Sequence, residues 1–411
     1  MSRLIVYLNG KNVGILEEND SRLQFRYRPE WLAAKEAYPL SKALPLQQES
    51  FEKQSRPFFA GILPKAEPRR KIAAVLGISA GNDFAMLARI GGECAGAVSL
   101  LPEDAPPPSP TENRLRRLSP RELTDIIAEL PRRPLLAGEK DLRLSLAGAQ
   151  DKLPVHLDAE GFALPLGNTP SSHIIKPEPQ RFPGLTANET FCMRLARAAG
   201  LTVPDVEMRR AGDTPYIIVK RYDRCIRPDG TIERIHQEDF CQALGFPPER
   251  KYQQEGGPRV RDCFSLLREW SSTPVLDIRE FVDGLVFNSL VGNADAHGKN
   301  FSMLYQNGTR RLAPFYDIVC TLAWPELSGT PAMKLGTARS INDLTLTHFQ
   351  RMAEESQLGW PSVRERIAKL SQRIRNALDR HSLDSVAGDA VASKVAKLIS
   401  DRTDKMLNQI K

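Results

Sequence analysis

The chain has 411 residues, of which 57 are basic and 50 acidic, so its formal net charge is +7. A hydrophobic content of 41% with 26% charged residues is typical of a globular protein and excludes a disordered or fibrous one. This length is sufficient for two or three packed units. The diffuse basic charge favours acidic partners such as nucleotides, RNA or an acidic protein surface.

The cysteines and the apolar segments indicate the compartment. The six cysteines show no CxxC pair and no histidine at zinc-finger spacing, so we expect reduced thiols without a disulfide framework or a zinc site. No segment approaches the roughly 18 apolar residues of a membrane span. Polar Asn9 follows too soon after the N-terminus for a signal peptide. The sequence therefore predicts a cytoplasmic protein that does not enter a membrane.

The N-terminus predicts a β-hairpin, because apolar runs at residues 4–8 and 13–16 flank the turn pair Asn9-Gly10. Short helices are expected near residues 70–76 and 83–89. Five prolines between Pro102 and Pro110 can neither continue a helix nor serve a central strand. We therefore expect a β-rich N-terminal subdomain over residues 1–105, followed by a linker or lobe boundary.

The middle of the chain alternates between predicted strands and helices. Residues 120–130 predict a helix, and residues 142–157 predict two strands around a turn at 147–152. A strand over 172–176 ends in Lys176, just before a proline. Asn188 is expected to cap a helix that carries Glu189 in its first turn and runs to Gly200. Strands over 203–208 and 215–220 follow.

The remainder is predicted to be mostly helical. Apolar residues between 278 and 290 recur at the spacing of one buried helix face, and this helix leads directly into Asp295. A hairpin with an Asn307-Gly308 turn is expected between Asn300 and Asp317. Further helices are expected over 363–378, with Pro361 in the first turn, and over 391–398.

Asp295, Asn300 and Asp317 have the spacing of protein-kinase catalytic machinery, in which the first Asp accepts the substrate hydroxyl proton and the other two residues bind Mg²⁺. Because a hairpin brings its ends together, Asn300 and Asp317 can share one cation. Mg²⁺ needs few protein ligands, since waters and phosphate oxygens complete its shell. Upstream, Lys176 and Glu189 follow the order of the kinase phosphate-binding lysine and its orienting glutamate.

Each of these residues taken alone has a structural explanation. Asp295 and Asn300 suit turns or caps, Lys176 suits a charged surface, and Glu189 suits the first turn of a helix. His297 alone would more often be structural than catalytic. Their joint order around suitable elements favours a phosphotransferase.

With these motifs the chain resembles the HipA-type serine/threonine kinases, the toxins of bacterial HipBA toxin–antitoxin modules. The resemblance covers nearly the whole length and is carried by stretches in a fixed order. They are residues 56–64, 144–152, 169–176, 237–242, 251–252, 256–258, 295–302 and 314–318.

The resemblance implies an α+β, two-lobed protein-kinase-like fold. Its N-lobe-like region, with phosphate loop and hinge, would span residues 106–225, and a helical C-lobe with the catalytic and metal-binding motifs would span 226–411. Asp295 would be the catalytic base, Asn300 and Asp317 would bind Mg²⁺, and Glu189 would orient Lys176. Contacts to ATP are implied for Lys176, Lys220, Tyr222, His297, Lys299, Ala147, Gly148, Ala149, Gln150 and Lys152.

The resemblance also implies inactivation by autophosphorylation at Ser145. A phosphate adds about −1.5 to −2 charges. In a loop that holds the phosphates of ATP, this charge would repel them and favour an ejected loop.

The implied partners are a HipB-like helix-turn-helix antitoxin, operator DNA contacted only through that antitoxin, and an aminoacyl-tRNA synthetase substrate, usually glutamyl-tRNA synthetase. Two alternatives stay open. One is a small-molecule phosphotransferase of the aminoglycoside-kinase type, against which the β-rich first 100 residues and the Ser145 loop argue. The other is a catalytically weak, antitoxin-binding corepressor.

Overall fold

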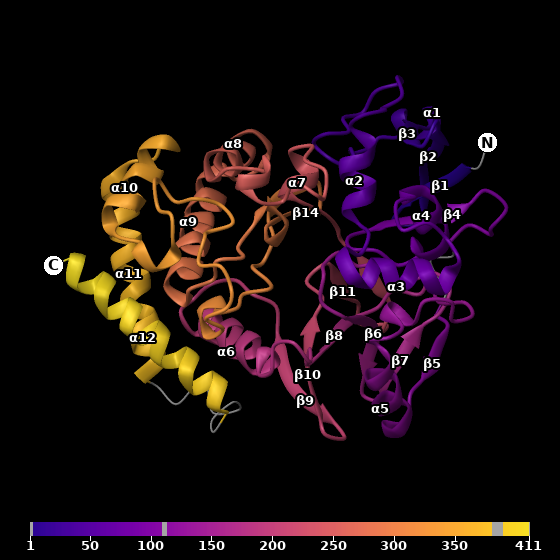
Figure 1. The fold of residues 1–411 in the computed structure, drawn as a ribbon. Helices are drawn as coiled ribbons and strands as arrows, with labels where there is room; N and C mark the ends of the chain where they lie inside the picture. The colour runs from indigo at the N-terminus through magenta and orange to yellow at the C-terminus, as the bar shows by residue number, and fades with distance from the viewer. Residues whose placement is uncertain (1–2, 109–112, 380–388, 411) are drawn as a thin grey trace.

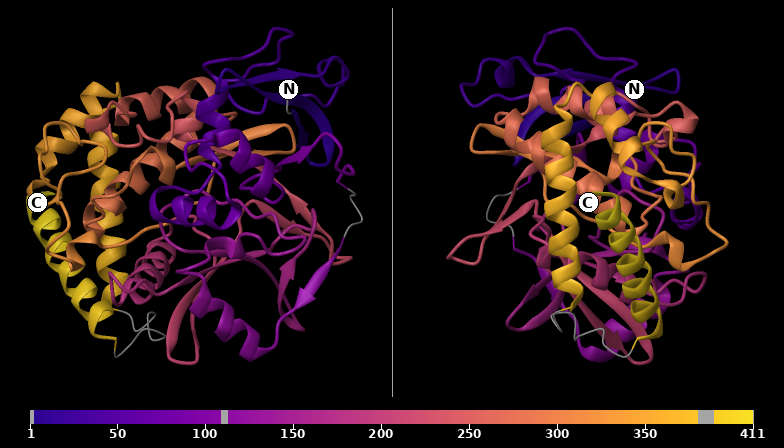
Figure 2. Two further views of the ribbon diagram at one scale, coloured as in Figure 1. Left: turned by 45° about the vertical axis from the view of Figure 1, so that its right-hand side comes forward. Right: turned by 90° about the vertical axis from the view of Figure 1, so that its left-hand side faces the viewer.

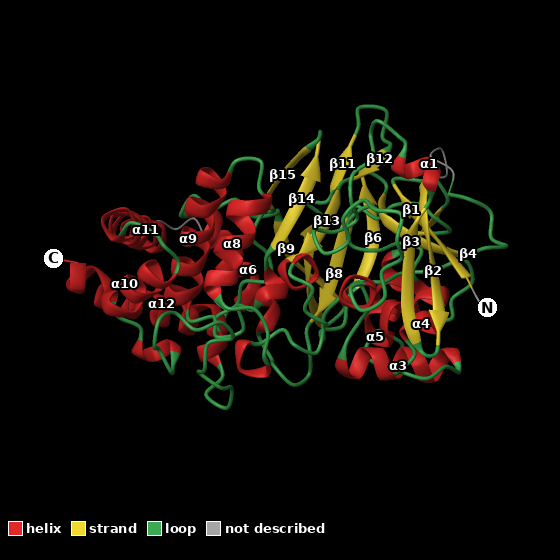
Figure 3. Ribbon diagram, turned by 90° about the horizontal axis from the view of Figure 1, so that it is seen from above, coloured by secondary structure: helices red, strands yellow, loops and turns green. Residues whose placement is uncertain are grey.

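The structure is a computed structural model that describes residues 3–108, 113–379 and 389–410. Figure 1 shows a strand-rich N-terminal half beside a helical C-terminal region. In the view from above, the strands lie to the right of the C-terminal helices, and α3 (Ala66–Leu76), α4 (Asp83–Ile90) and α5 (Pro120–Glu129) lie along the lower side of the strands (Figure 3). No helix among the described residues is long and apolar enough to cross a membrane.

The N-terminal region contains a four-stranded antiparallel sheet in the order β3-β2-β1-β4. The predicted hairpin is confirmed, because Asn9 and Gly10 join β1 to β2 with φ angles of 50° and 76°, as a tight turn requires. The predicted helices near residues 70–76 and 83–89 are confirmed as well. The elements are β1 (Arg3–Leu8), β2 (Lys11–Asn19), β3 (Arg22–Tyr27), β4 (Val98–Pro102), α1 (Pro29–Leu32), α2 (Ser55–Gly61), α3 (Ala66–Leu76) and α4 (Asp83–Ile90).

A six-stranded antiparallel sheet follows, in the order β5-β7-β6-β8-β10-β9. Its strands are β5 (Leu115–Arg117), β6 (Leu153–Asp158), β7 (Gly161–Pro165), β8 (His173–Pro177), β9 (Val206–Ala211) and β10 (Thr214–Lys220), with α5 (Pro120–Glu129) before β6. The prediction of two strands within residues 142–157 is wrong for the first of them. That segment instead makes isolated bridges, Leu144 with Glu93 and Gly148 with Pro64. Its backbone groups are thus satisfied by the N-terminal region.

The predicted start of helix α6 (Leu185–Ala198) at Asn188 is also wrong. The Glu178 carboxylate accepts hydrogen bonds from the first backbone amides of this helix, including Thr186 N at 2.9 Å. Asn188 lies one turn inside, fully buried, and its side chain bonds both the N–H and the C=O of Cys320. An amide that could cap a helix is therefore used to fix the segment after Asp317.

The C-terminal region is mostly helical, and the predicted hairpin is confirmed as β14 (Ser302–Gln306) and β15 (Thr309–Leu312), with Asn307 and Gly308 at positive φ. β13 (His236–Asp239) completes this sheet. In Figure 2 the two last helices run side by side along the outer edge. The remaining elements are β11 (Arg224–Ile226), β12 (Ile232–Arg234), α7 (Phe240–Ala243), α8 (Val260–Trp270), α9 (Pro274–Val291), α10 (Leu346–Glu355), α11 (Trp360–Asp379) and α12 (Ala390–Ile410).

Two large hydrophobic cores hold the molecule together. The first runs from Leu4 to Ile218 and is shared by the four-stranded sheet, α2–α5 and the six-stranded sheet. The second runs from Phe191 to Met406 and is built from α6 and the C-terminal helices. The predicted boundaries at residues 105 and 225 stay predictions. The proline-rich segment ends at Pro110, and its last two residues lie outside the described residues.

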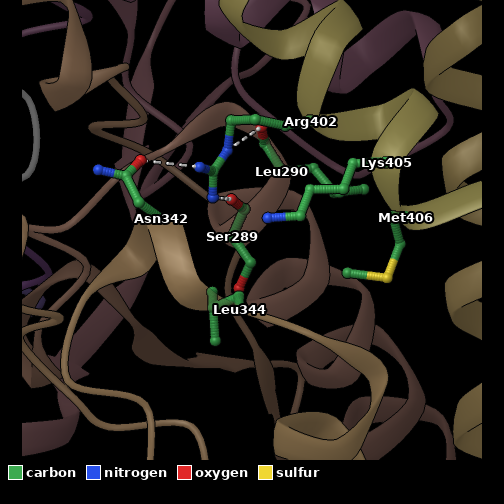
Figure 4. Close-up of a pocket in the computed structure, with 7 residues that line it drawn as sticks. All are labelled: Ser289, Leu290, Asn342, Leu344, Arg402, Lys405 and Met406. Atoms are coloured by element: carbon green, nitrogen blue, oxygen red, sulfur yellow. Dashed lines mark hydrogen bonds between the residues drawn. The ribbon is translucent and has the colours of Figure 1, made fainter. Parts of the chain in front are cut away.

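Helix α12 is tied to the end of α9 by one half-buried arginine. Arg402 donates hydrogen bonds to the backbone carbonyls of Ser289 and Leu290 and to the side chain of Asn342 (Figure 4). It also donates to the backbone carbonyl of Ile341. Lys405 and Met406 line the same small cavity. Because Ser289 and Leu290 are in the last turn of α9, a cation here also opposes the negative end of the helix dipole. The C-terminal helix thereby supports the loop that carries Asp295.

Candidate active site

Three charged residues meet between the six-stranded sheet and the C-terminal region. Lys176 Nζ on β8 donates to Glu189 Oε1 on α6 at 2.6 Å and to Asp317 Oδ1 at 2.8 Å. The side chains of Lys176 and Glu189 are 9% and 2% exposed, whereas that of Asp317 is 46% exposed. Burial alone would lower the pKa of Lys176, but the two carboxylates outweigh it and raise that pKa. Lys176 is therefore a fixed positive charge beside an open carboxylate.

Asn300 lies next to the same carboxylate. Asn300 Nδ2 donates to Asp317 Oδ2 at 3.1 Å, and Asn300 Oδ1 accepts from the His297 backbone N–H at 3.2 Å. Asp317 has a φ of 59°, in the left-handed region, which a neighbourhood this densely bonded can maintain. Lys176 is the main cause of the lowered pKa of Asp317, so its carboxylate is ionised.

Asn300 and Asp317 fit the chemistry of Mg²⁺, because an ionised carboxylate and an amide lie side by side at one edge of the cleft. The amide oxygen accepts from the His297 N–H here, so it would have to turn to reach an ion beside Asp317. Among the described residues no three His, Cys, Asp or Glu side chains form a metal cluster. That is compatible with Mg²⁺, which takes most of its ligands from water and phosphate. When bound, Mg²⁺ would supply positive charge that neutralises the phosphates of a nucleotide.

Asp295 stands just beyond α9 in a loop held from two sides. Gly292 ends α9 with a φ of 75°. The N–H of Ala294 donates to Thr321 Oγ1 at 3.0 Å, and the Asp295 N–H donates to Asn293 Oδ1 at 3.1 Å. Desolvation raises the pKa of the Asp295 carboxyl, while nearby Lys251 and a hydrogen bond from Tyr252 oppose this rise. The side chain is nevertheless exposed to the cleft.

His297 is buried as a neutral imidazole. Its Nε2 lies 2.8 Å from Lys251 Nζ, an ammonium that can only donate, so Nε2 accepts and the proton is placed on Nδ1. Burial and then Lys251 lower the pKa of His297. Within the described part of the chain His297 Nδ1 is buried and has no hydrogen-bond partner. It is an unpaired donor that is closed off from solvent in this structure.

Lys299 connects this loop to the N-terminal region. Lys299 Nζ donates to the Gly61 carbonyl at 3.1 Å and also pairs with Asp239. Lys65, from the segment after α2, lies close by. Burial and the charges of Lys299 and Lys251 lower its pKa to about 7. Sequence reasoning did not single out Lys65, because nothing local indicates that residue 65 approaches residue 299.

Two backbone carbonyls of the predicted phosphate loop accept hydrogen bonds from within the protein. Lys152 Nζ donates to the Ala147 carbonyl at 2.7 Å, and the Lys65 N–H donates to the Gly148 carbonyl at 3.1 Å. Gly148 has a φ of 118°, and a Cβ there would lie 2.3 Å from Lys152 Nζ. Ala149 is exposed, and Gln150 Nε2 is buried without a partner in the described chain.

Ser145 lies just before this loop and is fully buried. Its Oγ donates to the Ile62 carbonyl at 3.2 Å, and its N–H donates to the Glu93 carbonyl at 2.9 Å. A phosphate cannot occupy this position without movement of the segment, because the hydroxyl faces packed backbone.

The predicted hinge follows β10. The Lys220 N–H is already used by the Asp205 carbonyl at 2.9 Å, so a ligand at this hinge would have to use the Lys220 carbonyl. The Lys220 side chain is exposed. Tyr222 stacks on Tyr316 with ring centroids 5.6 Å apart, and its hydroxyl donates to Gln237. The two hinge residues are thus ordered by different neighbours.

A buried charge cluster that sequence reasoning missed surrounds this hinge. The Glu93 carboxylate accepts hydrogen bonds from Arg221 at 3.0 Å, Arg224 at 2.8 Å and Arg234 at 2.7 Å. Asp223 pairs with Arg221 at 2.7 Å. The alternating charges of residues 221–224 are visible in the sequence, but nothing local connects them to Glu93, more than 120 residues earlier.

Comparison with known proteins identifies the class. The family model for the HipA-like C-terminal domain matches residues 144–378, and that for the HipA N-terminal domain matches residues 4–101. The chain therefore belongs to the HipA family. The predicted α+β, two-lobed kinase-like fold with a β-rich N-terminal subdomain and a mostly helical C-terminal lobe is confirmed.

Individual relatives extend over almost the entire chain. The Sinorhizobium fredii protein Y4mE is 44% identical over 409 residues, which covers 94% of this chain and 97% of that protein. The serine/threonine-protein kinase toxin HipA of Shewanella oneidensis is 30% identical, covering 86% of this chain and 82% of the toxin. The structure of Shewanella oneidensis HipA with HipB and operator DNA matches with a TM-score of 0.86 and 26% identity, over 99% of this chain and 98% of that one.

Proposed function

We propose that this protein is an ATP-dependent serine/threonine protein kinase that acts as the toxin of a toxin–antitoxin pair. The observation that carries the proposal is the contact of Lys176 with both Glu189 and Asp317, beside Asn300. It joins a phosphate-binding lysine to a metal-binding pair, with Asp295 accessible in the same cleft.

Each residue of the site has its own role in the proposed reaction. Lys176 holds phosphate oxygens of ATP in a position fixed by Glu189. Asp295 accepts the proton of the attacking hydroxyl, and Asn300 with Asp317 holds Mg²⁺. Lys299 and the free Nδ1–H of His297 add donors at the phosphate end.

The nucleotide is held by two backbone segments. In the phosphate loop, residues 147–150 and Lys152 surround the phosphates, and Lys152 exchanges its bond to Ala147 for one to a phosphate oxygen. The carbonyl of Lys220 and the backbone of Tyr222 hold the adenine. In this assignment the adenine uses the Lys220 carbonyl, because the Lys220 N–H is already bonded to the Asp205 carbonyl.

Ser145 is the proposed site of inactivating autophosphorylation. Because Ser145 is buried, the loop must move out of its place before the hydroxyl can be modified. A phosphate of about −1.5 to −2 charges would then oppose both its return and the phosphates of ATP.

The proposed partners follow from the relatives. The matched Shewanella structure contains HipA, HipB and operator DNA, which supports a HipB-like antitoxin that contacts operator DNA for this chain. The proposed substrate is an aminoacyl-tRNA synthetase in the cytoplasm, with glutamyl-tRNA synthetase the first to test. Phosphorylating that enzyme would stop tRNA charging and growth.

The test measures incorporation of label from [γ-³²P]ATP with Mg²⁺, followed by mass spectrometry of the protein. Wild type should incorporate label at Ser145, and Asp295→Asn should reduce the rate by at least about 10²-fold. Asp125→Asn, an exposed acid on α5, is the matched control and should behave as wild type. Equal incorporation by wild type and Asp295→Asn would show that the catalytic assignment is wrong.

Two further measurements separate the alternatives. Phosphate transfer to an aminoglycoside without any on Ser145 would favour a small-molecule kinase. Growth arrest that persists with Asp317→Ala would favour the corepressor, since that variant lacks the proposed metal ligand.

A further inference from the structure

One loop outside the predicted catalytic motifs contacts two members of the site. Lys251 and Tyr252 precede α8 and reach the loop that follows α9. Tyr252 OH donates to Asp295 Oδ1 at 2.7 Å, and Lys251 Nζ donates to His297 Nε2 at 2.8 Å. The Lys251 ammonium also lies 4.6 Å from the centroid of the Tyr252 ring, and the Tyr252 and His297 rings are 5.4 Å apart. We call Lys251 and Tyr252 the clamp.

The clamp is held in place from its far side. The Gln253 N–H donates to the Ala332 carbonyl at 2.9 Å, and the Lys334 N–H donates to Gln253 Oε1 at 2.8 Å. The Gly257 N–H closes the loop onto the Tyr252 carbonyl at 2.9 Å, in a space where a Cβ would lie 2.4 Å from the Arg250 carbonyl. The position of the Tyr252 hydroxyl is therefore set by backbone contacts.

The clamp leaves half of the Asp295 carboxylate free. Over the described residues, Tyr252 provides the one hydrogen bond to this side chain, and it goes to Oδ1. A carboxylate turns easily about its last side-chain torsion, which is broad and roughly two-fold. A hydrogen bond to one oxygen selects an orientation and directs the other oxygen, Oδ2, toward the cleft.

We propose that Tyr252 is a positioning residue for phosphoryl transfer, which fixes Asp295 so that Oδ2 faces the incoming hydroxyl group. This inference rests on the proposed kinase function and deepens it. Lys251 completes the arrangement, because its bond to His297 Nε2 leaves the Nδ1–H of that ring for the nucleotide.

The step balances without further reactants. The acceptor oxygen forms a bond to the γ-phosphorus as the bond from that phosphorus to the bridging oxygen breaks, leaving ADP. The hydroxyl proton passes to Asp295 Oδ2 and then to solvent. Tyr252 keeps its own proton throughout, since desolvation and then Asp295 raise the pKa of its phenol.

The test is Tyr252→Phe, which removes one oxygen and keeps the ring. The first-order rate of label incorporation at saturating MgATP should fall roughly 10- to 100-fold, as expected for a misplaced catalytic group. The MgATP concentration for half the maximal rate should change less than about twofold, because Phe keeps the ring that packs against His297 and lacks only the hydroxyl group. Tyr7→Phe, on the N-terminal sheet, is the control and should match wild type.

The outcomes distinguish this inference from the function on which it rests. An unchanged maximal rate in Tyr252→Phe overturns the positioning role. So does a loss that appears only as a higher half-saturating MgATP concentration. If wild type itself transfers no phosphate, the kinase proposal fails. The positioning role is then decided by crystal structures of both proteins, in which Asp295 should hold one orientation in wild type and several in Tyr252→Phe. A single identical orientation in both would overturn it.

Discussion

Replacing Glu93 by Gln tests whether the buried charge cluster holds the N-terminal region against the hinge. Glu93 is 1% exposed and accepts hydrogen bonds from Arg221, Arg224 and Arg234 as well as from Ser171. The amide of Gln has nearly the same shape, but it carries no charge and replaces one acceptor oxygen by a donor. The substitution therefore leaves Asp223 as the remaining buried counter-charge for Arg221 and Arg224, and it removes the acidic partner of Arg234.

The expected cost is large because the arginines cannot reach water. Removing one partner of a buried ion pair destabilises a protein by about 3–5 kcal/mol. For a cooperative unit of 150–250 residues this lowers the melting temperature by roughly 6–20 °C. The first hydrophobic core, from Leu4 to Ile218, has this size.

The assay is thermal unfolding followed by circular dichroism, with Asp158→Asn as the control. Asp158 also pairs with an arginine, Arg117 at 2.7 Å, but those side chains are 33% and 39% exposed. Breaking an exposed pair should cost at most about 1 kcal/mol. A Glu93→Gln melting temperature no lower than that of Asp158→Asn would refute the reasoning. Because Arg221 lies between the hinge residues, MgATP affinity should weaken as well.

Three other substitutions give separate tests. Burial raises the pKa of Glu238 to about 7 from an ordinary 4.5, so the folded state retains a proton that the unfolded state releases. The stability of wild type relative to Glu238→Gln should thus fall as pH rises from about 4.5 to 7, in urea titrations across that range. Gly148→Ala should raise the half-saturating MgATP concentration roughly tenfold, through strain at a φ of 118° and contact with Lys152, and the same strain should lower the melting temperature. Arg402→Met should destabilise the protein by about 2–5 kcal/mol in urea unfolding, because buried carbonyls at the end of α9 lose their charged donor.

The elements predicted correctly are those specified by neighbouring residues. Both Asn-Gly hairpins depend on two turn residues, and α9 depends on the apolar spacing of a single helix face. The start of α6 was wrong because its cap, Glu178, precedes it by several residues, and Asn188 serves a contact with Cys320 instead. The local pattern cannot distinguish these uses.

The candidate site shows the same division. Asp295, Asn300 and Asp317 could be selected because their spacing within one segment is informative. The contact of Tyr252 with Asp295 joins residues 43 apart, and those of Glu93 with its arginines join residues 128 or more apart. Such pairs depend on how whole elements pack, which a single sequence does not specify.

The first strands share one hydrophobic core with the six-stranded sheet. This affects the order in which the chain can fold during synthesis. The ribosome releases β1–β4 well before β8 and β10. Until those strands emerge, the N-terminal region lacks part of its hydrophobic core. Glu93 lacks its last arginine partner until Arg234 has emerged. A product that ends before this point would carry an exposed apolar surface and a carboxylate without its full set of arginines. The proposed nucleotide hinge is thus completed only when more than half of the polypeptide has been synthesised.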